Sequence, residues 1–177
     1  MTVLLVSGST RHGSTNTAVL RTIATLDPAR TRMFTLLADL PPFDPDADRD
    51  PLPPPVAALR GALAETTAVL FCTPEYAGAL PGAFKNLLDW TVGGAEMPGK
   101  PAAWINVSSP AAPTGGAGAH AELGTVLGYV GARVVEGACR RIPLTRSHVD
   151  ADGLVTDPQV RAELEEALHT FLAAASG

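Results

Sequence analysis

Residues 3–26 read VLLVSGSTRHGSTNTAVLRTIATL, and this stretch decides the fold. It begins with a continuous apolar run rich in β-branched side chains, which is typical of a strand buried on both faces. Small and polar residues follow, and apolar side chains at helical spacing then predict a helix from near Asn16 to the Asp27-Pro28 pair. Strand, glycine-bearing loop and helix in this order predict the first part of a parallel sheet.

The same alternation continues along the chain. Apolar runs predict further strands at residues 33–37, 68–72, 102–107 and 134–139. Helical periodicity predicts further helices at residues 56–65, 81–90, 117–130 and 158–174. Because parallel strands need crossover helices that shield the sheet, we expect an α/β fold with five parallel strands in the order 2-1-3-4-5 and helices on both faces. This doubly wound arrangement is called flavodoxin-like.

The chain has 177 residues, 46% of them hydrophobic, which suits one domain with one core. Residues 39–55 hold seven prolines and five aspartates, a composition that disfavours both a helix and a central strand. We interpret this segment as a surface excursion whose acidic run, residues 44–50, is solvated. A linker is less favoured, because the residues before it are too few for a core of their own. We therefore predict a single domain over residues 1–177.

Charge and cysteine content exclude several classes of function. A formal net charge of −5 disfavours binding to nucleic acid or to an anionic membrane. No segment approaches the roughly 20 apolar residues of a membrane span, and the apolar run at the start is too short for a signal peptide. Cys72 and Cys139 lack a partnering pattern and the histidines lack ligand spacing, so we expect buried inert thiols, no disulfide and no metal site. These features predict a cytoplasmic protein.

The loop after the first strand is suited to bind a phosphate group. Residues 8–17 read GSTRHGSTNT and place two glycines, several hydroxyls and Arg11 just before a helix. Backbone N–H groups at a helix start bind anions, hydroxyls donate to them, and arginine adds a full charge. Helix capping by Ser14 or Asn16 is the simpler interpretation, but capping needs one such residue and the loop supplies six.

The same loop indicates which kind of phosphate it takes. It has Ser14 where a nucleotide-hydrolysing P-loop has lysine, and it lacks the G-x-G-x-x-G of dinucleotide folds. A terminal monophosphate held by hydroxyls suits a mononucleotide such as FMN, which flavodoxin-like sheets bind where the strand order reverses.

Two more loops share this small-residue character. Residues 73–82 read TPEYAGALPG and residues 108–118 read SSPAAPTGGAG, and they follow the third and fourth predicted strands. The first of these loops either reads the edge of a flat ring while Tyr76 packs beside the ring, or is a plain connection in which Tyr76 covers the core. The loop after the second strand is acidic and would repel a phosphate. In the order 2-1-3-4-5 the loops after strands one, three and four are neighbours, so we expect them to form one site.

Three motifs carry a resemblance to a known family: GSTRHGSTN near the start, PEYAGALPGAFKNLLDW in the middle and the later SSPAAPTGG. They resemble the NADPH-dependent FMN reductase family, flavodoxin-like proteins that include chromate, quinone and azo-dye reductases. The resemblance covers nearly the whole chain, and the middle motif is its specific part. It implies that FMN is the cofactor, that NADPH or NADH is the co-substrate, and that the protein forms a homodimer or homotetramer.

The resemblance also implies a set of cofactor-binding residues. The FMN phosphate would be held by Ser9, Arg11, Ser14, Asn16 and Thr17. The edge of the flavin ring would be read by Pro74, Glu75, Tyr76, Ala77 and Gly78, and the ring would lie along Ser108, Gly115 and Gly116. The chain departs from the family at two places. Members usually have Asn and Ser where this chain has Ala77 and Ala79, and an arginine common soon after the double glycine is replaced by Gly118 or Ala119.

We therefore expect an enzyme that transfers hydride from NAD(P)H to FMN and then electrons to a small-molecule acceptor: a quinone, an azo compound, a metal oxyanion or free flavin. The flavin supplies the chemistry, so no catalytic side chain is predicted. The alternative is a flavodoxin-like FMN electron carrier without nicotinamide oxidation. A charge of −5 and nine aromatic residues weigh against it, because dedicated carriers tend to be strongly acidic and to stack the ring between aromatics. A scaffold that binds no FMN is disfavoured, because three glycine-rich loops would then meet without a ligand.

Several large apolar residues are predicted to serve packing. Trp90 and Trp104 are assigned to packing or to a subunit contact rather than to stacking on the flavin. The apolar stretch at residues 79–88, together with Trp90 and Met97, is either core or a contact between subunits.

Overall fold

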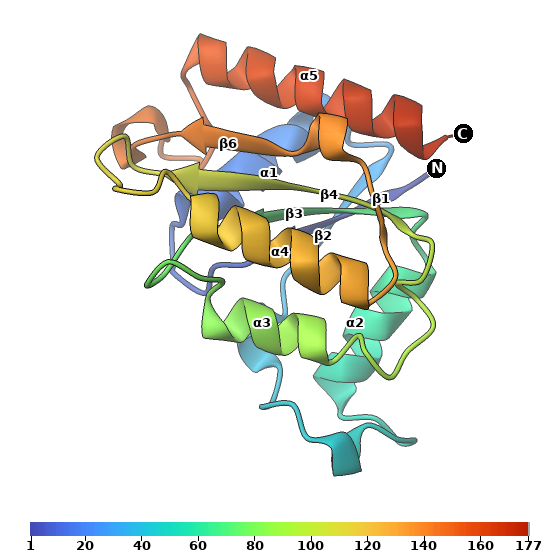
Figure 1. The fold of residues 1–177 in the computed structure, drawn as a ribbon. Coiled ribbons are helices and arrows are strands. Elements are labelled where there is room, and N and C mark those ends of the chain that lie inside the picture. The colour runs from blue at the N-terminus through green and yellow to red at the C-terminus, as the bar shows by residue number, and fades with distance from the viewer. Residues whose placement is uncertain (177) are drawn as a thin grey trace.

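A parallel sheet forms the centre of the molecule (Figure 1) in this computed structural model, which describes residues 1–176. Its strands are β1 (Val3–Ser7), β2 (Thr31–Phe34), β3 (Ala68–Thr73), β4 (Pro101–Ser108), β5 (Arg133–Val134) and β6 (Arg140–Pro143). Neighbouring strands follow the order β2-β1-β3-β4-β5, and β6 pairs with β4 as well. Each of these pairings is parallel. The predicted flavodoxin-like order 2-1-3-4-5 is confirmed.

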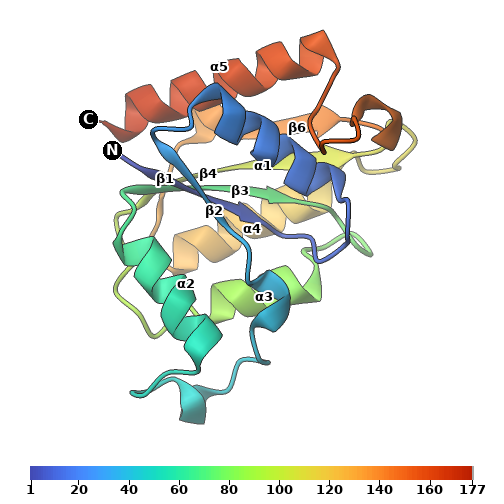
Figure 2. The same cartoon turned by 180° about the vertical axis from the view of Figure 1, so that it is seen from behind.

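Helices cover both faces of the sheet (Figure 2). They are α1 (Thr15–Leu26), α2 (Pro54–Ala64), α3 (Gly82–Asp89), α4 (Ala117–Tyr129) and α5 (Pro158–Ala175). α1 and α5 lie on one face, and α2, α3 and α4 lie on the other. Successive residues of β1 alternate between the two cores: Leu4 and Val6 pack on the α2–α4 side, whereas Val3 and Leu5 pack on the side of α1 and α5. This double coverage explains why the first strand is a continuous apolar run.

The last predicted strand is wrong in its extent. Residues 134–139 do not form one strand, because β5 has only two residues and a 3₁₀ turn at Glu136–Ala138 separates it from β6. Glu136 and Gly137 interrupt the apolar run, and Ala138 is buried in the core shared with α5. The chain therefore turns where the sequence pattern predicts a straight strand.

β6 has no counterpart among the predicted strands. It pairs with β4 and exposes two of its residues: Ile142 is buried, whereas Arg141 and Pro143 are exposed. A half-exposed strand of four residues lacks the continuous apolar run that identifies the buried strands. The strand predicted at residues 33–37 differs less from the structure. β2 spans Thr31–Phe34, and residues 37–39 form a 3₁₀ turn.

The proline-rich excursion after β2 is fastened to two helices. The carbonyl oxygen of Pro41 accepts hydrogen bonds from Trp90 Nε1 and from Asn86 Nδ2, both at 2.8 Å. The carboxylate of Asp48 pairs with the guanidinium of Arg60 at 2.5 Å, and these side chains are only 10% and 13% exposed. The prediction that the acidic run is solvated is therefore wrong at Asp48.

The large apolar residues whose role the sequence left open belong to the core. Phe84, Leu87, Leu88, Trp90 and Met97 are at most 1% exposed, and Trp104 is 4% exposed. These side chains therefore pack inside the chain and are not available for a subunit contact.

The two cysteines differ in burial. Cys72 is fully buried, and burial raises the pKa of its thiol well above the usual range. Cys139 is only partly buried at the edge of the core, which differs from the predicted buried position, and desolvation raises the pKa of its thiol to about 11. Within residues 1–176, none of the helices combines the length and apolar character needed to cross a membrane.

Candidate functional site

The loops after β1, β3 and β4 border two adjoining cavities. The smaller cavity, about 150 Å³, lies against the loop after β1 and the start of α1. The larger cavity, about 430 Å³, lies between the loops after β3 and β4. Both cavities are lined by Pro74, Val107, Ser108 and Ser109. The three loops therefore meet at one place, as their positions in the sheet predict.

The structure brings most of the predicted site residues to these cavities. The smaller cavity is lined by Ser9, Arg11, Ser14, Asn16, Pro74, Tyr76 and Ser108. The larger cavity is lined by Pro74, Glu75, Ala77, Gly78, Ser108 and Gly116. Thr17 and Gly115 line neither. The hydroxyl of Thr17 lies 2.9 Å from that of Ser7, and Gly115 borders a neighbouring cavity beside Arg141.

The loop after β1 offers backbone donors at the smaller cavity. Ser14 caps α1, because its hydroxyl accepts a hydrogen bond from the N–H of Asn16 at 3.2 Å. Within residues 1–176, the N–H groups of His12, Gly13 and Thr15 have no hydrogen-bond acceptor. Unpaired N–H groups at a helix start, next to Arg11, complement a phosphate. Helix capping and anion binding are thus compatible in this loop.

Asn16 is held by the buried thiol beneath it. Cys72 Sγ donates to Asn16 Oδ1 at 3.4 Å, and the raised pKa keeps this thiol protonated. The Asn16 side chain is therefore oriented with its oxygen toward the sheet, which leaves its amide nitrogen free to donate.

Arg146 reaches the smaller cavity from a distant part of the chain, and the sequence pattern does not predict it. It lies in the 3₁₀ turn Arg146–His148 that follows β6. Its guanidinium donates a hydrogen bond to the carbonyl oxygen of Gly13. A Cβ at Gly13 would lie 2.8 Å from Arg146 Nη2, so glycine permits this approach. The cavity is thereby lined by two arginines, Arg11 and Arg146.

The loop after β3 contains a tight turn. Tyr76 and Ala79 exchange backbone hydrogen bonds of 3.0 and 3.1 Å, and the central residues Ala77 and Gly78 have φ of +53° and +78°. Positive φ at both central residues is the requirement of a type I′ turn. Tyr76 is 55% exposed and lines the smaller cavity, so the alternative in which it covers the core is wrong.

Ala77 occupies a backbone conformation that suits asparagine better than alanine. Its φ of +53° lies in the left-handed region, where asparagine is tolerated and alanine is strained. Where the resemblance implies an asparagine, this chain therefore keeps the turn but adds backbone strain.

Glu75 joins the two loops that border the larger cavity. Its Oε1 accepts from the hydroxyl of Thr114, and its Oε2 accepts from the N–H of Ala119 at 3.0 Å. The hydrogen bond from Thr114 and then that from Ala119 hold the pKa of this carboxyl below its usual value. Glu122 of α4 makes a second link, since its Oε2 accepts a hydrogen bond from the N–H of Leu80 at 2.6 Å. Two carboxylates thus fasten the loop after β3 to α4.

The second departure from the family has a steric cause. A Cβ at Gly118 would overlap the carbonyl oxygen of Gly78, and Ala119 is fully buried. A side chain at residue 118 would displace the turn after β3, and an arginine at residue 119 would bury its charge in the core. Close packing of α4 on this turn therefore disfavours the arginine that the resemblance implies.

The two cavities fit FMN in chemistry and in size. The smaller one combines unpaired N–H groups, hydroxyls and two arginines, which is the donor set for a phosphate. The larger one is walled by backbone and small side chains, which suits a flat ring, and its volume of about 430 Å³ is typical of cofactor sites. Across residues 1–176 no cluster of His, Cys, Asp and Glu is arranged to hold a metal ion.

Comparison with known proteins identifies the family. Residues 1–143 match the family described as NADPH-dependent FMN reductase. The chain belongs to this family. The predicted resemblance to NADPH-dependent FMN reductases is thus confirmed, and with it the expectation of an oxidoreductase that uses FMN and NAD(P)H.

Individual relatives of this FMN reductase family member match over nearly their full length. The chain is 31% identical to the NAD(P)H-dependent FMN reductase of Pseudomonas aeruginosa, covering 96% of this chain and 92% of the relative. It is 30% identical to the 2-hydroxy-1,4-benzoquinone reductase of a Burkholderia species, and the match covers 97% of this chain and 94% of the relative. Among solved structures, the flavoenzyme NAD(P)H:(acceptor) oxidoreductase FerB of Paracoccus denitrificans superposes with a TM-score of 0.86 at 31% identity. The superposition covers 99% of this chain and 97% of the FerB chain.

Proposed function

We propose that this chain is an NAD(P)H-dependent FMN reductase that binds FMN in the two adjoining cavities and passes electrons to a small-molecule acceptor. The observation that carries the proposal is the junction of an arginine-lined phosphate cavity with a cavity walled by backbone and small residues. The bound flavin accepts hydride from NAD(P)H and delivers electrons to the acceptor. Quinones are the first acceptor to test, because relatives include quinone reductases. Azo compounds, metal oxyanions and free flavin remain further candidates.

The residues of this chain bind and orient the cofactor. We assign the phosphate to Ser9, Arg11, Ser14, Asn16 and Arg146, with Thr17 supporting the helix start. The turn at residues 74–78 presents backbone N–H and C=O groups to the ring edge, and Ser108, Gly115 and Gly116 border the ring. Preorganised donors of this kind stabilise the charge that develops on a reduced ring without reorganisation. No side chain is assigned a catalytic role.

An electron carrier without nicotinamide oxidation is the second function considered. Family membership favours the reductase, since the matched family is named for NADPH-dependent reduction. The likeness to flavodoxin structures, at 21% identity and a TM-score of 0.64, reflects the shared fold alone.

An absorbance spectrum followed by anaerobic titration with NADPH and NADH tests the proposal. We expect flavin bands in protein purified after incubation with FMN, loss of these bands on adding NAD(P)H, and their return on adding a quinone. Protein that binds no FMN would contradict the proposal. Protein that binds FMN but stays oxidised with both nicotinamides would support the electron carrier instead.

We further propose a single domain over residues 1–177, a homodimer or homotetramer, and a cytoplasmic location. The large apolar side chains in and near α3 that the sequence offered for a subunit contact are core, so we expect other side chains to form the contact surface. Light scattering at micromolar concentration tests the oligomer, and a mass of one chain would contradict it.

A further inference from the structure

A third cavity, here called the outer cavity, lies beside the loop after β1. Its volume is about 420 Å³, and it is bordered by that loop, by the first two turns of α1 and by residues 146–153. It shares Arg11, Gly13, Ser14 and Arg146 with the smaller cavity of the flavin site. None of the residues of the turn after β3 or of the loop after β4 lines it. The outer cavity is therefore adjacent to the proposed phosphate end of the flavin site and separate from its ring end.

Positive charge is concentrated in the outer cavity. Arg11, Arg21 and Arg146 line it, and Asp150 is the one carboxylate among its lining residues. Asp150 is already engaged, because its Oδ1 accepts from the N–H of Leu154 at 2.8 Å. The ion pairs found within residues 1–176 include none of these three arginines. In a chain with a net charge of −5, three guanidinium groups without a carboxylate partner favour an anion in this cavity. Arg11 and Arg146 are shared with the proposed FMN phosphate site, whereas Arg21 belongs to the outer cavity alone.

Two of the arginines that flank this cavity each lie close to a glycine. Arg146 lies against Gly13, to whose carbonyl oxygen it donates. Arg21 lies against Gly153, where a Cβ would come within 2.8 Å of Arg21 Nη1. Gly153 has a φ of +77°, so a larger residue is disfavoured there by conformation as well as by contact. The two guanidinium groups therefore lie beside backbone that a larger residue would block.

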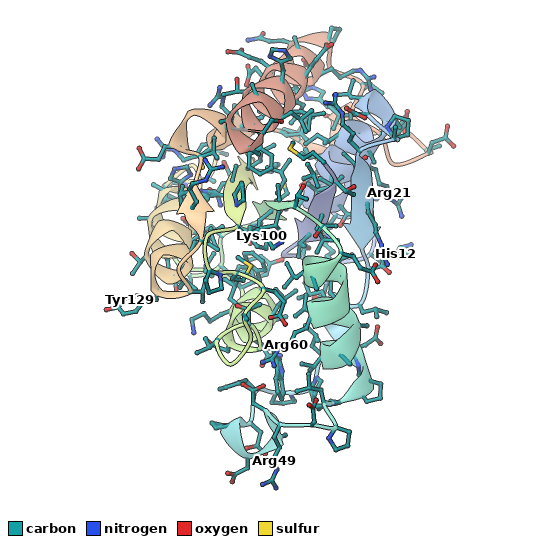
Figure 3. The ribbon with its side chains drawn as sticks, turned by 90° about the vertical axis from the view of Figure 1, so that its right-hand side faces the viewer. His12, Arg21, Arg49, Arg60, Lys100 and Tyr129 are labelled. Atoms are coloured by element: carbon teal, nitrogen blue, oxygen red, sulfur yellow. The ribbon has the colours of Figure 1, made fainter. Side chains whose placement is uncertain are left out.

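We propose that the outer cavity is a second anion site that binds a phosphate group other than the phosphate of FMN. Arginine pairs bind phosphate oxygens through several charge-assisted hydrogen bonds at once. His12 also lines the cavity, and Figure 3 shows it on the same side of the molecule as Arg21. The phosphate chemistry has two possible sources near a nicotinamide-dependent flavoenzyme, the 2′-phosphate of NADPH and free inorganic phosphate. Binding of the NADPH 2′-phosphate rests on the proposed function, whereas binding of inorganic phosphate does not.

Arg21→Gln is the decisive variant, because Arg21 lines the outer cavity and neither cavity of the flavin site. Arg49→Gln is the matched control: it makes the same charge change at an exposed arginine at the far end of the molecule (Figure 3). Isothermal titration calorimetry measures the Kd of NADP⁺, NAD⁺ and inorganic phosphate for wild type and both variants. The protein is saturated with FMN, so that the flavin site is filled. Circular dichroism checks that each variant is folded.

Two results support the second anion site. If it takes the 2′-phosphate, Arg21→Gln weakens NADP⁺ binding about tenfold and leaves NAD⁺ binding unchanged. If it takes free phosphate, Arg21→Gln weakens inorganic phosphate binding by a similar factor and leaves both nucleotides unchanged. Equal Kd values for wild type and Arg21→Gln with all three probes would overturn the proposal, as would an equal loss in Arg49→Gln. If FMN itself fails to bind, the proposed function fails, and the inorganic phosphate titration still decides on the outer cavity.

Discussion

The backbone N–H of Ala119 donates a hydrogen bond to Glu75 Oε2 over 3.0 Å and 44 residues of sequence. This contact, with that of Thr114 to the other oxygen of the same carboxylate, joins the turn after β3 to the first turn of α4. The turn after β3 and the segment that leads into α4 both line the larger cavity. The carboxylate therefore links two walls of the space proposed for the flavin ring.

Glu75→Gln tests this connection through its pH dependence. Because hydrogen bonds lower the pKa of Glu75 from 4.5 in the folded protein, its contribution to the free energy of unfolding is complete above that value and is lost as the pH falls through the lower folded pKa. We expect wild type to be more stable than Glu75→Gln at pH 7, with the difference vanishing in acid. Urea unfolding of both proteins from pH 7 to pH 3 measures this difference in the free energy of unfolding. A difference that persists or grows in acid would show that the carboxylate charge is irrelevant.

Gly118→Ala is expected to push the same two walls apart. The added Cβ overlaps the carbonyl oxygen of Gly78, so we predict a loss of roughly 1–3 kcal/mol in the free energy of unfolding and weaker FMN binding. Thermal unfolding and fluorescence titration with FMN measure the two effects. Gly128→Ala on the same helix is the control, because its Cβ meets nothing within 4 Å. That control should be stabilised by about 0.5–1 kcal/mol.

Ala77→Gly is expected to stabilise the protein. At a φ of +53° glycine avoids the strain that alanine carries, and we predict a gain of about 0.5–1 kcal/mol in the free energy of unfolding. Ala79 has no such strain, so Ala79→Gly in the same turn should lower the free energy of unfolding by about 0.5–1 kcal/mol. Chemical denaturation of the two variants gives the comparison, and a loss of stability in Ala77→Gly would refute the argument from backbone strain.

Arg146→Gln is expected to weaken FMN binding about tenfold, because a charged donor at the phosphate end is lost. Arg146→Lys keeps the charge without the planar guanidinium, so its Kd should lie between those of wild type and Arg146→Gln. Riboflavin lacks the phosphate, and its weaker binding should be unaffected by either change. Fluorescence titration measures all these Kd values, and an equal effect on riboflavin would place Arg146 outside the phosphate site.

The parts of the fold that could be predicted from the sequence are those decided by local pattern. β1, β3 and β4 are buried on both faces, so their residues form continuous apolar runs. The loops of the site were predicted as well, because glycine, serine and threonine before a helix are a local signal. Contacts between segments that are far apart in sequence have no such local signal.

Four features show where local pattern fails. β6 is half-exposed and carries two arginines, so it does not read as a strand. The burial of Asp48 depends on Arg60, and the burial of Trp90 depends on the excursion that covers it. Arg146 belongs to the site only because the turn after β6 reaches the loop after β1. Each of these depends on tertiary contacts between segments that are far apart in sequence.

The contact of Arg146 with Gly13 also bears on the order of events during synthesis. The two residues are 133 positions apart, and Arg146 lies beyond residue 143, where the match to the family ends. At typical ribosomal rates, Arg146 is made on the order of ten seconds after Gly13. A nascent chain that has already made the first strands therefore still lacks Arg146 beside the loop after β1. Because we assign Arg146 to the FMN phosphate, we expect full affinity for FMN only after the turn at Arg146–His148 has been made.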